Sequence, residues 1–365
     1  MSLRFVGDTA IQTNSGYLEL YRTSPTEDAE WDVQFDSLSL QQFDNFAIEV
    51  RDSGGSATFS TDLTDITTTV RDCLVANADG FVQYTTRSPF GGSNRVDCLD
   101  NVCTAITEET FEIRIRESFS AAPSQFDLSS PNTLNVLRNT LEAPVSDDKM
   151  ARLLLSPAGP GNVVRVHNNV GVSERGVLVN PSFEDVPGTA LDVDIRNNDF
   201  ASNGSDPCLM LEVTGWLLTN RPKMDARVLN NRLGGAGEVL FVRGACDLDG
   251  GALVVAYNEF SRSNENELSE YHVSYGDWTI LHHGNMHRAG GDDTEPGIDV
   301  NLYDDPHLRA CDFRASNNLL WGCGSGIAFA SGTSSRDAGR IVNNTVVFCG
   351  QSSNSIALGS HGSAV

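Results

Sequence analysis

Hydrophobic and polar residues alternate in short stretches that recur along the chain, and each stretch ends at an asparagine. Apolar residues stand three and five positions before the asparagine, as Val166 and Val164 do before Asn169. In most stretches a further apolar residue stands two positions after it, as Leu233 does after Asn231. A period of two is typical of a strand with one buried face, so each stretch predicts a strand, a bend and the start of another strand.

The marked asparagines recur 26 to 33 residues apart along most of the chain. They are Asn139, Asn169, Asn198, Asn231, Asn258, Asn285, Asn318 and Asn344. A period of this length with variable insertions indicates a solenoid whose coils share a core but not their loops. We therefore predict an all-β fold, a right-handed parallel β-helix solenoid of about ten or eleven coils with an Asn ladder. Asparagine suits the bend because it tolerates left-handed backbone angles and its amide can bond the next coil.

The two ends of the chain depart from this repeat. Residues 1–40 are β-rich but off the pattern, so we expect an N-terminal β cap followed by a parallel β-helix over residues 41–365. The segment Ser355–Gly359 has the pattern of a strand with no cap after it. A solenoid end exposes an unpaired strand edge, so self-association through the C-terminal end is a possibility that this pattern leaves open.

The chain is acidic, with a formal net charge of -24, and this narrows its partners. Long-range repulsion disfavours binding to nucleic acid or to an anionic membrane surface. No run of 18 or more apolar residues is present, so we expect no membrane span.

Two pairs of cysteines are spaced by about one coil: Cys73 with Cys98, and Cys323 with Cys349. This spacing predicts that each pair lies on adjacent coils, with a disulfide in at least one of them. A disulfide implies an oxidising compartment, so we expect an extracellular or cell-surface protein whose signal peptide is not present in this chain. A virion component is the other location considered.

One coil carries polar residues where the others carry apolar ones. His282 and His287 occupy the inward positions on either side of Asn285, and five of the 7 histidines lie within 36 residues of one another. The same segment holds Tyr275, Tyr303 and several acidic residues. A buried imidazole needs a polar partner, so the segment 270–310 is the candidate functional site, with buried structural histidines as the alternative interpretation.

The asparagine-marked coils resemble the pectate-lyase-like β-helix superfamily over roughly residues 40–360. Within that range, Tyr303-Asp304-Asp305-Pro306-His307 resembles the Y-G-F-D-P-H motif of alginate C-5 epimerases, with Asp304 alone in place of Gly-Phe. This resemblance implies catalytic roles for Tyr303, Asp305 and His307, to which we add His282 and His287 as candidates. The lysine of that family has no counterpart, so the expected substrate-binding residues are the following: Arg288, Tyr275 and Arg309.

Pectate lyases bind Ca²⁺ through clusters of aspartates, and this resemblance implies a metal site here as well. The candidate ligands are Asp292, Asp293, Glu295 and Asp299. Carboxylate oxygens are suitable ligands for Ca²⁺, the one cofactor considered. A metal held by His282 and His287 is a further possibility.

Three classes of function stay open at this point. The first is an extracellular protein that acts on or binds polysaccharide, for example a uronate-polymer lyase or epimerase. The second is a noncatalytic surface, adhesion or spacer module. The third is a virion tailspike or fibre component. Whether the chain is an enzyme is not decided by these patterns.

Overall fold

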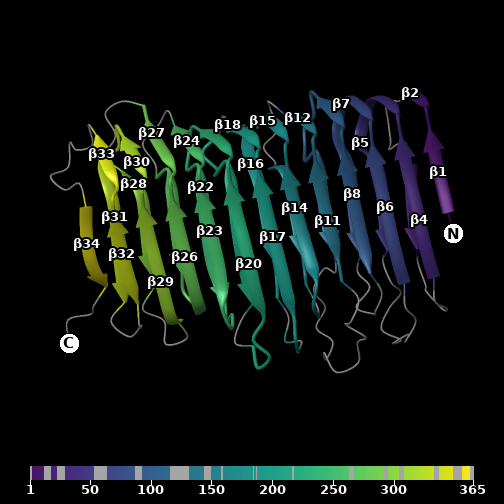
Figure 1. Ribbon diagram of the computed structural model, residues 1–365. Helices are drawn as coiled ribbons and strands as arrows, with labels where there is room; N and C mark the ends of the chain where they lie inside the picture. The colour runs from purple at the N-terminus through teal and green to yellow at the C-terminus, as the bar shows by residue number, and fades with distance from the viewer. Residues whose placement is uncertain are drawn as a thin grey trace.

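The computed structural model is an all-β parallel solenoid in which the chain passes repeatedly along three walls (Figure 1). The N-terminus and the C-terminus lie at opposite ends of the stack (Figure 1). The structure describes residues 2–11, 18–22, 29–52, 64–86, 93–115, 131–143, 149–157, 159–183, 185, 187–215, 218–262, 267–290, 295–303, 308–332, 337–347 and 356–361. The prediction of an all-β parallel solenoid is confirmed.

The first wall is a twelve-stranded parallel sheet with one strand from each coil. Its strands are β1 (Ser2–Val6), β4 (Ala29–Asp36), β6 (Thr64–Arg71), β8 (Asn94–Leu99), β11 (Thr133–Leu137), β14 (Asn162–His167), β17 (Ala190–Arg196), β20 (Lys223–Leu229), β23 (Gly251–Ala256), β26 (Gly276–His283), β29 (Leu308–Ser316) and β32 (Ala338–Val342).

The second and third walls share a 22-stranded parallel sheet. The second wall contains β2 (Thr9–Ile11), β9 (Val102–Thr104), β12 (Thr140–Ala143), β15 (Val170–Ser173), β18 (Asp199–Ser202), β21 (Arg232–Gly235), β24 (Glu259–Arg262), β27 (Met286–Ala289), β30 (Leu319–Trp321) and β33 (Thr345–Val347). The third wall contains β3 (Leu18–Arg22), β10 (Phe111–Ile115), β13 (Lys149–Leu155), β16 (Arg175–Pro181), β19 (Leu209–Gly215), β22 (Leu240–Cys246), β25 (Ser269–Val273), β28 (Pro296–Leu302), β31 (Ser325–Gly332) and β34 (Ile356–His361). Two long strands, β5 (Ser39–Asp52) and β7 (Leu74–Thr86), run through both walls.

The core is a set of apolar columns that run the length of the solenoid. Val164, Val193, Ala226 and Leu253 pair in register on successive strands of the first wall, and each is at most 1% exposed. Alternate residues of a strand face the same side. The shared register of the strands therefore places every residue of such a column inside the solenoid. The predicted inward positions are therefore confirmed.

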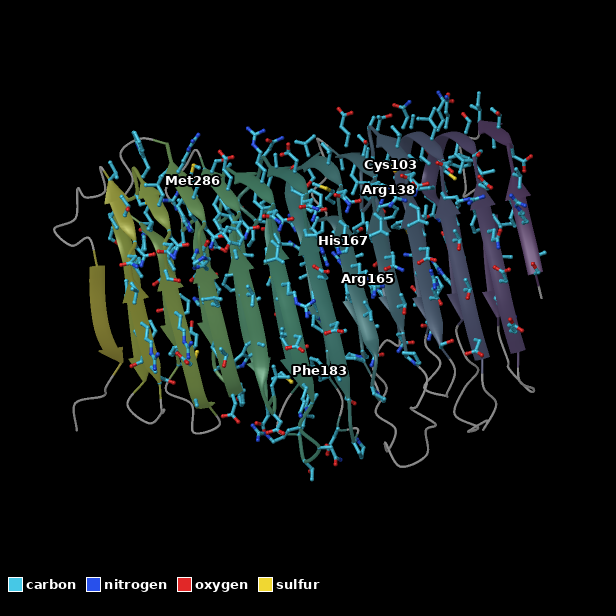
Figure 2. The ribbon with its side chains drawn as sticks, viewed as in Figure 1. Cys103, Arg138, Arg165, His167, Phe183 and Met286 are labelled. Atoms are coloured by element: carbon cyan, nitrogen blue, oxygen red, sulfur yellow. The ribbon has the colours of Figure 1, made fainter. Side chains whose placement is uncertain are left out.

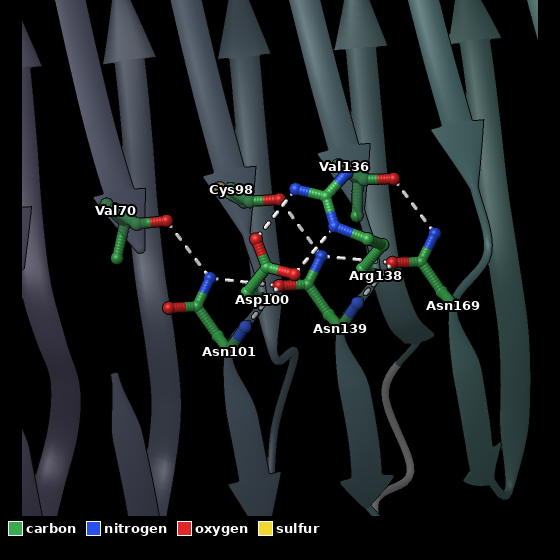
Figure 3. Close-up of polar contacts among 8 residues, drawn as sticks. All are labelled: Val70, Cys98, Asp100, Asn101, Val136, Arg138, Asn139 and Asn169. Carbon is green, nitrogen blue, oxygen red and sulfur yellow. Dashed lines mark hydrogen bonds and ion pairs between the residues drawn. The ribbon is translucent and has the colours of Figure 1, made fainter. Parts of the chain in front are cut away.

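The Asn ladder stands at the corner between the first and second walls (Figure 3). Asn139 donates from its backbone N and its Nδ2 to Oδ1 of Asn169, at 2.9 and 3.0 Å, and its Nδ2 also donates to the carbonyl of Cys98 at 3.0 Å. The same bonds recur from Asn169 to Asn344, which confirms the ladder. Asn101 is one further rung that we did not predict.

The backbone of the bend differs from our explanation of it. The left-handed residue is the one before each ladder asparagine, with φ of 56° at Asn168 and 58° at Arg138. The ladder asparagine itself is not among the residues with positive φ. Two neighbouring positions therefore have separate roles, since the first turns the chain and the second, which is buried, satisfies the backbone groups of the turn.

A second, shorter ladder lies at the start of the first-wall strands. Asn94 donates to Oδ1 of Asn132, and Asn132 donates to Oδ1 of Asn162. All three side chains are buried. The sequence analysis did not find this ladder because it spans only three coils.

The segment 1–40 joins the solenoid in register. Leu3 pairs with Val33 and Phe5 pairs with Phe35 in the first wall, and the two phenylalanine rings stack with centroids 5.2 Å apart. At the other end, β32 pairs with β29 and with no further strand among the described residues.

The described cysteines are free thiols, and all seven are buried. Cys73 and Cys98 lie on adjacent coils as predicted, but no disulfide joins them. Cys73 stands in the column of the Asn ladder, where its backbone N–H donates to Oδ1 of Asn101 and its thiol donates to the carbonyl of Phe35. Cys349, the partner predicted for Cys323, lies outside the described residues.

The outer surface of the first wall is polar along several coils. Arg165 and His167 project from β14 (Figure 2). Asn135 donates from Nδ2 to Oδ1 of Asp97 at 2.6 Å, and Arg165 donates to Oδ1 of Asn135 at 3.3 Å. His167 lies 3.4 Å from a carboxylate oxygen of Asp194. This stretch of wall carries charged and amide side chains on successive coils.

Candidate functional site

The two histidines at core positions lie inside the solenoid, where they contact each other. His282 and His287 are 0% exposed, and their Nε2 atoms are 2.9 Å apart. The Nδ1 atom of His282 hydrogen-bonds the hydroxyl of Tyr271, which is also 0% exposed, at 2.6 Å. These three side chains form an internal polar chain that spans the core from the third wall to the first and second walls.

The internal chain is electrically neutral near pH 7. Burial lowers the pKa of His287 to about 3. Burial and the neighbouring His287 lower the pKa of His282 well below its usual value. Phe260 packs on the imidazole of His287, with ring centroids 4.9 Å apart. Because the pair is enclosed by the core, a polymer on the surface does not reach it in this conformation.

A different set of titratable side chains gathers on the outer face of the third wall. Its members come from the end of the β21–β22 connection, from β25 and its preceding segment, and from β28 and the residue that follows it. They are Glu238, Glu267, Glu270, His272, Asp299, Asn301 and Tyr303, and we call them the third-wall cluster. Register explains the grouping, since Glu270 pairs with Asp299 and His272 pairs with Asn301.

The centre of the third-wall cluster is a trio of glutamates. One carboxylate oxygen from each of Glu238, Glu267 and Glu270 lies within 4.8 Å of the others. His272 donates from Nε2 to Glu270, and its Nδ1 is 3.2 Å from the hydroxyl of Tyr303. Carboxylates that crowd together in this way share a proton or hold a cation, because like charges at such distances repel strongly. Among the residues that the structure describes, the trio is also the group that can hold a metal ion through three carboxylates.

Crowding and partial burial change the protonation of these groups. Burial, with the added repulsion of Glu270 and Glu267, raises the pKa of Glu238 to about 7. Burial also raises the pKa of Glu267 and of Asp299. Burial acts to lower the pKa of His272, but the hydrogen bond and charge of Glu270 outweigh it, so that pKa is raised. Carboxyls of raised pKa beside an imidazole whose pKa is also raised are typical of acid–base sites.

Half-buried apolar side chains continue the same outer row on the preceding coils. Leu178, Met210 and Phe241 pair in register with one another, and Phe241 then pairs with Glu270. The ring of Phe241 meets the imidazole of His272 edge to face at a centroid distance of 5.1 Å. The third wall therefore presents an apolar strip that runs directly into the glutamates.

The structure places the predicted site residues in several regions. Tyr303 and Asp299 belong to the third-wall cluster. Glu295 is half-buried, and its carbonyl accepts hydrogen bonds from Gly324 and Ser325. Asp292, Asp293, Asp305, His307 and the side chain of Arg309 lie outside the described residues.

The remaining two predicted substrate-binding residues, Arg288 and Tyr275, are not members of the cluster. Arg288 is exposed on the second wall, where its Nε contacts Sδ of Met286 at 3.1 Å and its Nη1 lies 3.6 Å from Glu259. Tyr275 accepts a hydrogen bond at its carbonyl from the indole of Trp278 at 2.7 Å. Tyr303 is 45% exposed whereas His282 and His287 are enclosed, so these predicted partners do not converge on one groove.

Sequence reasoning missed Glu238, Glu267 and Glu270. Their positions on one wall follow from aligning the third-wall strands, and those strands have no regularly recurring asparagine to mark the register. The signal that was available is the alternation in Ser269–Val273, where Ser269, Tyr271 and Val273 face inward and Glu270 and His272 lie between them.

Comparisons with protein-family models, curated proteins and solved structures found no match to this chain. The resemblances to pectate-lyase-like proteins and to alginate epimerases therefore rest on the quoted residues alone. In the described part of the chain, no helix is suited to crossing a bilayer.

Proposed function

We propose that the protein hydrolyses a polysaccharide that lies along the third wall, with Glu238 as the proton donor. The observation that carries this proposal is the glutamate trio, in which one carboxyl has a pKa of about 7 beside two others. The parallel solenoid is compatible with proteins that act on polysaccharide, and its third wall is a continuous surface across many coils.

The chemistry of glycoside hydrolysis needs two carboxyl groups in different protonation states. One donates a proton to the leaving oxygen, and the other attacks the sugar or activates water. Glu238 holds its proton to near-neutral pH, while Glu270, which accepts a hydrogen bond from His272, is the proposed second carboxyl. Oxygen separations within 4.8 Å are closer to the retaining arrangement, with carboxyls about 5 to 5.5 Å apart, than to the wider inverting one.

Local charge favours an uncharged glycan as the substrate. The trio and Asp299 are acidic, and the chain as a whole carries a formal charge of -24, so a polyuronate is repelled. The apolar strip of Phe241 and Met210 suits the C–H faces of sugar rings, while Asn301 and Tyr303 offer hydrogen bonds to hydroxyl groups. The lyase and epimerase chemistry expected from the sequence has less support, because Arg243, the nearest cation on β22, is paired with Glu212 at 2.9 Å.

The test is an incubation of the protein with soluble β-glucan and xylan, and separately with polygalacturonate and alginate. We expect new reducing ends from a neutral polymer and no unsaturated uronate absorbance from the acidic ones. Glu238→Gln should lower the rate by roughly a hundredfold or more. Glu212→Gln, which removes the same charge from the same wall outside the trio, is the matched control and should retain activity. Unsaturated products, or equal rates for the wild type and Glu238→Gln, would contradict the proposal.

Calcium at the trio is the competing chemistry. Three carboxylates can supply oxygen ligands to Ca²⁺, and a bound cation would also offset the repulsion of a polyuronate. The same incubation with a chelator separates the two cases. Hydrolysis by Glu238 should persist without Ca²⁺, whereas a calcium-dependent lyase should stop.

A noncatalytic spacer or surface module is the second candidate function. It is favoured by the burial of His282 and His287, because these two candidate catalytic residues are enclosed by the core. In that case the neutral polymers should yield no reducing ends, and substitutions in the trio should affect stability alone.

A further inference from the structure

A solvent-exposed tyrosine stands at the ladder corner in the coil formed by β23 and β24. Tyr257 is 61% exposed and has a φ of 58°. The other coils place small or flexible residues at this left-handed position. These are Gly7, Ser37, Asp72, Asp100, Arg138, Asn168, Asn197, Asn230, Gly284, Asn317 and Asn343. An aromatic residue in this backbone region is unfavourable, so its presence needs a reason beyond the turn itself.

The next coil accommodates the ring of Tyr257. Gly284 lies beneath it, and a Cβ at Gly284 would stand 2.9 Å from two ring carbons of Tyr257. His283 meets the ring edge to face, with centroids 5.5 Å apart and an interplanar angle of 88°. His283 is itself fixed by a hydrogen bond of 2.9 Å from its Nδ1 to the hydroxyl of Ser316. The orientation of the Tyr257 ring is therefore set before any ligand arrives.

The first wall beside Tyr257 carries apolar side chains where the adjacent coils carry charged ones. Val254 and Leu281 are adjacent in one register row of the first wall, and both are half-buried. In that row they stand between two exposed arginines, Arg227 and Arg314. The result is an aromatic and aliphatic patch two coils wide, with a phenol hydroxyl and an imidazole at its edge.

We infer that the exposed ring of Tyr257, with His283 at its side, is a platform on which a pyranose ring of a polysaccharide stacks. A sugar ring presents a face of C–H groups to an aromatic surface while its hydroxyls bond polar groups at the rim, and this patch supplies both. Parallel strands repeat at roughly 4.8 Å, so a patch two coils wide matches a short run of sugar units. The platform lies on the first wall and at the corner between the first and second walls, away from the third-wall cluster. It shares with the proposed hydrolysis only the class of ligand.

Other occupants fit the patch less well. A stable protein interface covers on the order of 800 Å² on each partner, which is far wider than two coils of one wall. A nucleobase would bring a phosphate backbone to a strongly acidic chain. A pyranose needs neither a large area nor opposite charge.

Affinity electrophoresis in gels that contain soluble β-glucan, xylan or polygalacturonate tests the platform. We expect at least one polymer to retard the wild type, and Tyr257→Asn to weaken that binding by roughly tenfold. Tyr257→Phe keeps the ring and should remain close to the wild type. Tyr257→Asn should also melt no lower than the wild type, because asparagine occupies this position in other coils, so the lost binding is not a loss of folding.

The two proposals fail separately in this design. Glu238→Gln should lose hydrolysis and keep its retardation in the gel, whereas Tyr257→Asn should lose retardation and keep hydrolysis of short soluble oligosaccharides. Equal retardation of Tyr257→Asn and the wild type, or no retardation of the wild type by any of the three polymers, would overturn the platform whatever the outcome for hydrolysis.

Discussion

The two faces of strand β25 (Ser269–Val273) carry similar polar side chains in opposite surroundings. Tyr271 points inward and reaches His282, while its neighbours Glu270 and His272 point outward into the third-wall cluster. Burial lowers the pKa of His282 well below its usual value, whereas the hydrogen bond and charge of Glu270 outweigh burial and raise the pKa of His272.

This contrast shows that residue type is a poor guide to role in a solenoid. The same side chain completes the core on one face and carries charge on the other, and only the strand's alternation decides which. Histidines at core positions are buried here, and the proposed chemistry uses the outer face, which the core pattern does not describe.

The largest expected effect comes from removing an inner histidine. His287→Ala should lower the free energy of unfolding by about 3 kcal/mol, because it leaves a cavity and deprives Nε2 of His282 of its partner. His272→Ala, on the outer face, should change it by less than about 1 kcal/mol. Urea denaturation of both variants measures the difference. Equal losses of unfolding free energy would mean that water reaches the internal polar chain.

The ladder corner offers the same comparison with two adjacent asparagines. Asn231 is 2% exposed and its amide joins Asn198, Asn258 and the carbonyl of Ile195, so Asn231→Ala should cost about 2 kcal/mol. Asn230 has a φ of 54° and points to solvent, so Asn230→Gly should be nearly neutral. The melting temperatures of the two variants measure this difference. An equal loss of stability at both positions would contradict the conclusion that one residue turns the chain and its neighbour provides the hydrogen bonds.

The pH dependence of stability should also separate the two faces. His287 has a native pKa of about 3 and an unfolded value near 6.5, so the unfolded chain binds its proton first and stability falls as pH drops below 6.5. At pH 5.5 the loss should be about 1 kcal/mol. Glu238 acts in the opposite sense, because its native pKa is raised and its contribution to stability is lost as pH rises toward 7.

The variant His287→Leu isolates the contribution of His287 to the pH dependence of stability. Leucine is suited to this position, since Leu320 fills the equivalent position in the next coil. We expect the stability of this variant to fall less between pH 7 and pH 5.5 than that of the wild type. An equal loss of unfolding free energy between pH 7 and pH 5.5 in the variant and the wild type, measured by urea denaturation, would show that His287 is not held neutral.

The repeat of asparagines and inward apolar residues was sufficient to predict the parallel solenoid, the first-wall columns and the ladder from Asn139 onward. The sequence did not reveal that Cys73 occupies a ladder position. Its thiol donates to the carbonyl of Phe35, as an asparagine amide donates to the equivalent carbonyl in later coils, so no asparagine marks this coil. The sequence indicated a polar segment at 270–310 but left open whether its histidines are catalytic or structural, since a core position and a catalytic position look alike until the burial of each face is known. Glu238 escaped notice because its neighbours in the cluster are distant in sequence.

The pH dependence of kcat/KM for hydrolysis of a neutral polysaccharide tests the central claim most directly. If Glu238 is the proton donor, activity requires its protonated form, so the rate should fall as pH rises through about 7. Glu238→Gln should lose at least roughly a hundredfold at the optimum, and Glu212→Gln should keep both the rate and the profile. A wild type that hydrolyses no neutral polysaccharide, or one whose activity persists unchanged above pH 7, would contradict the assignment of the third-wall cluster as the active site.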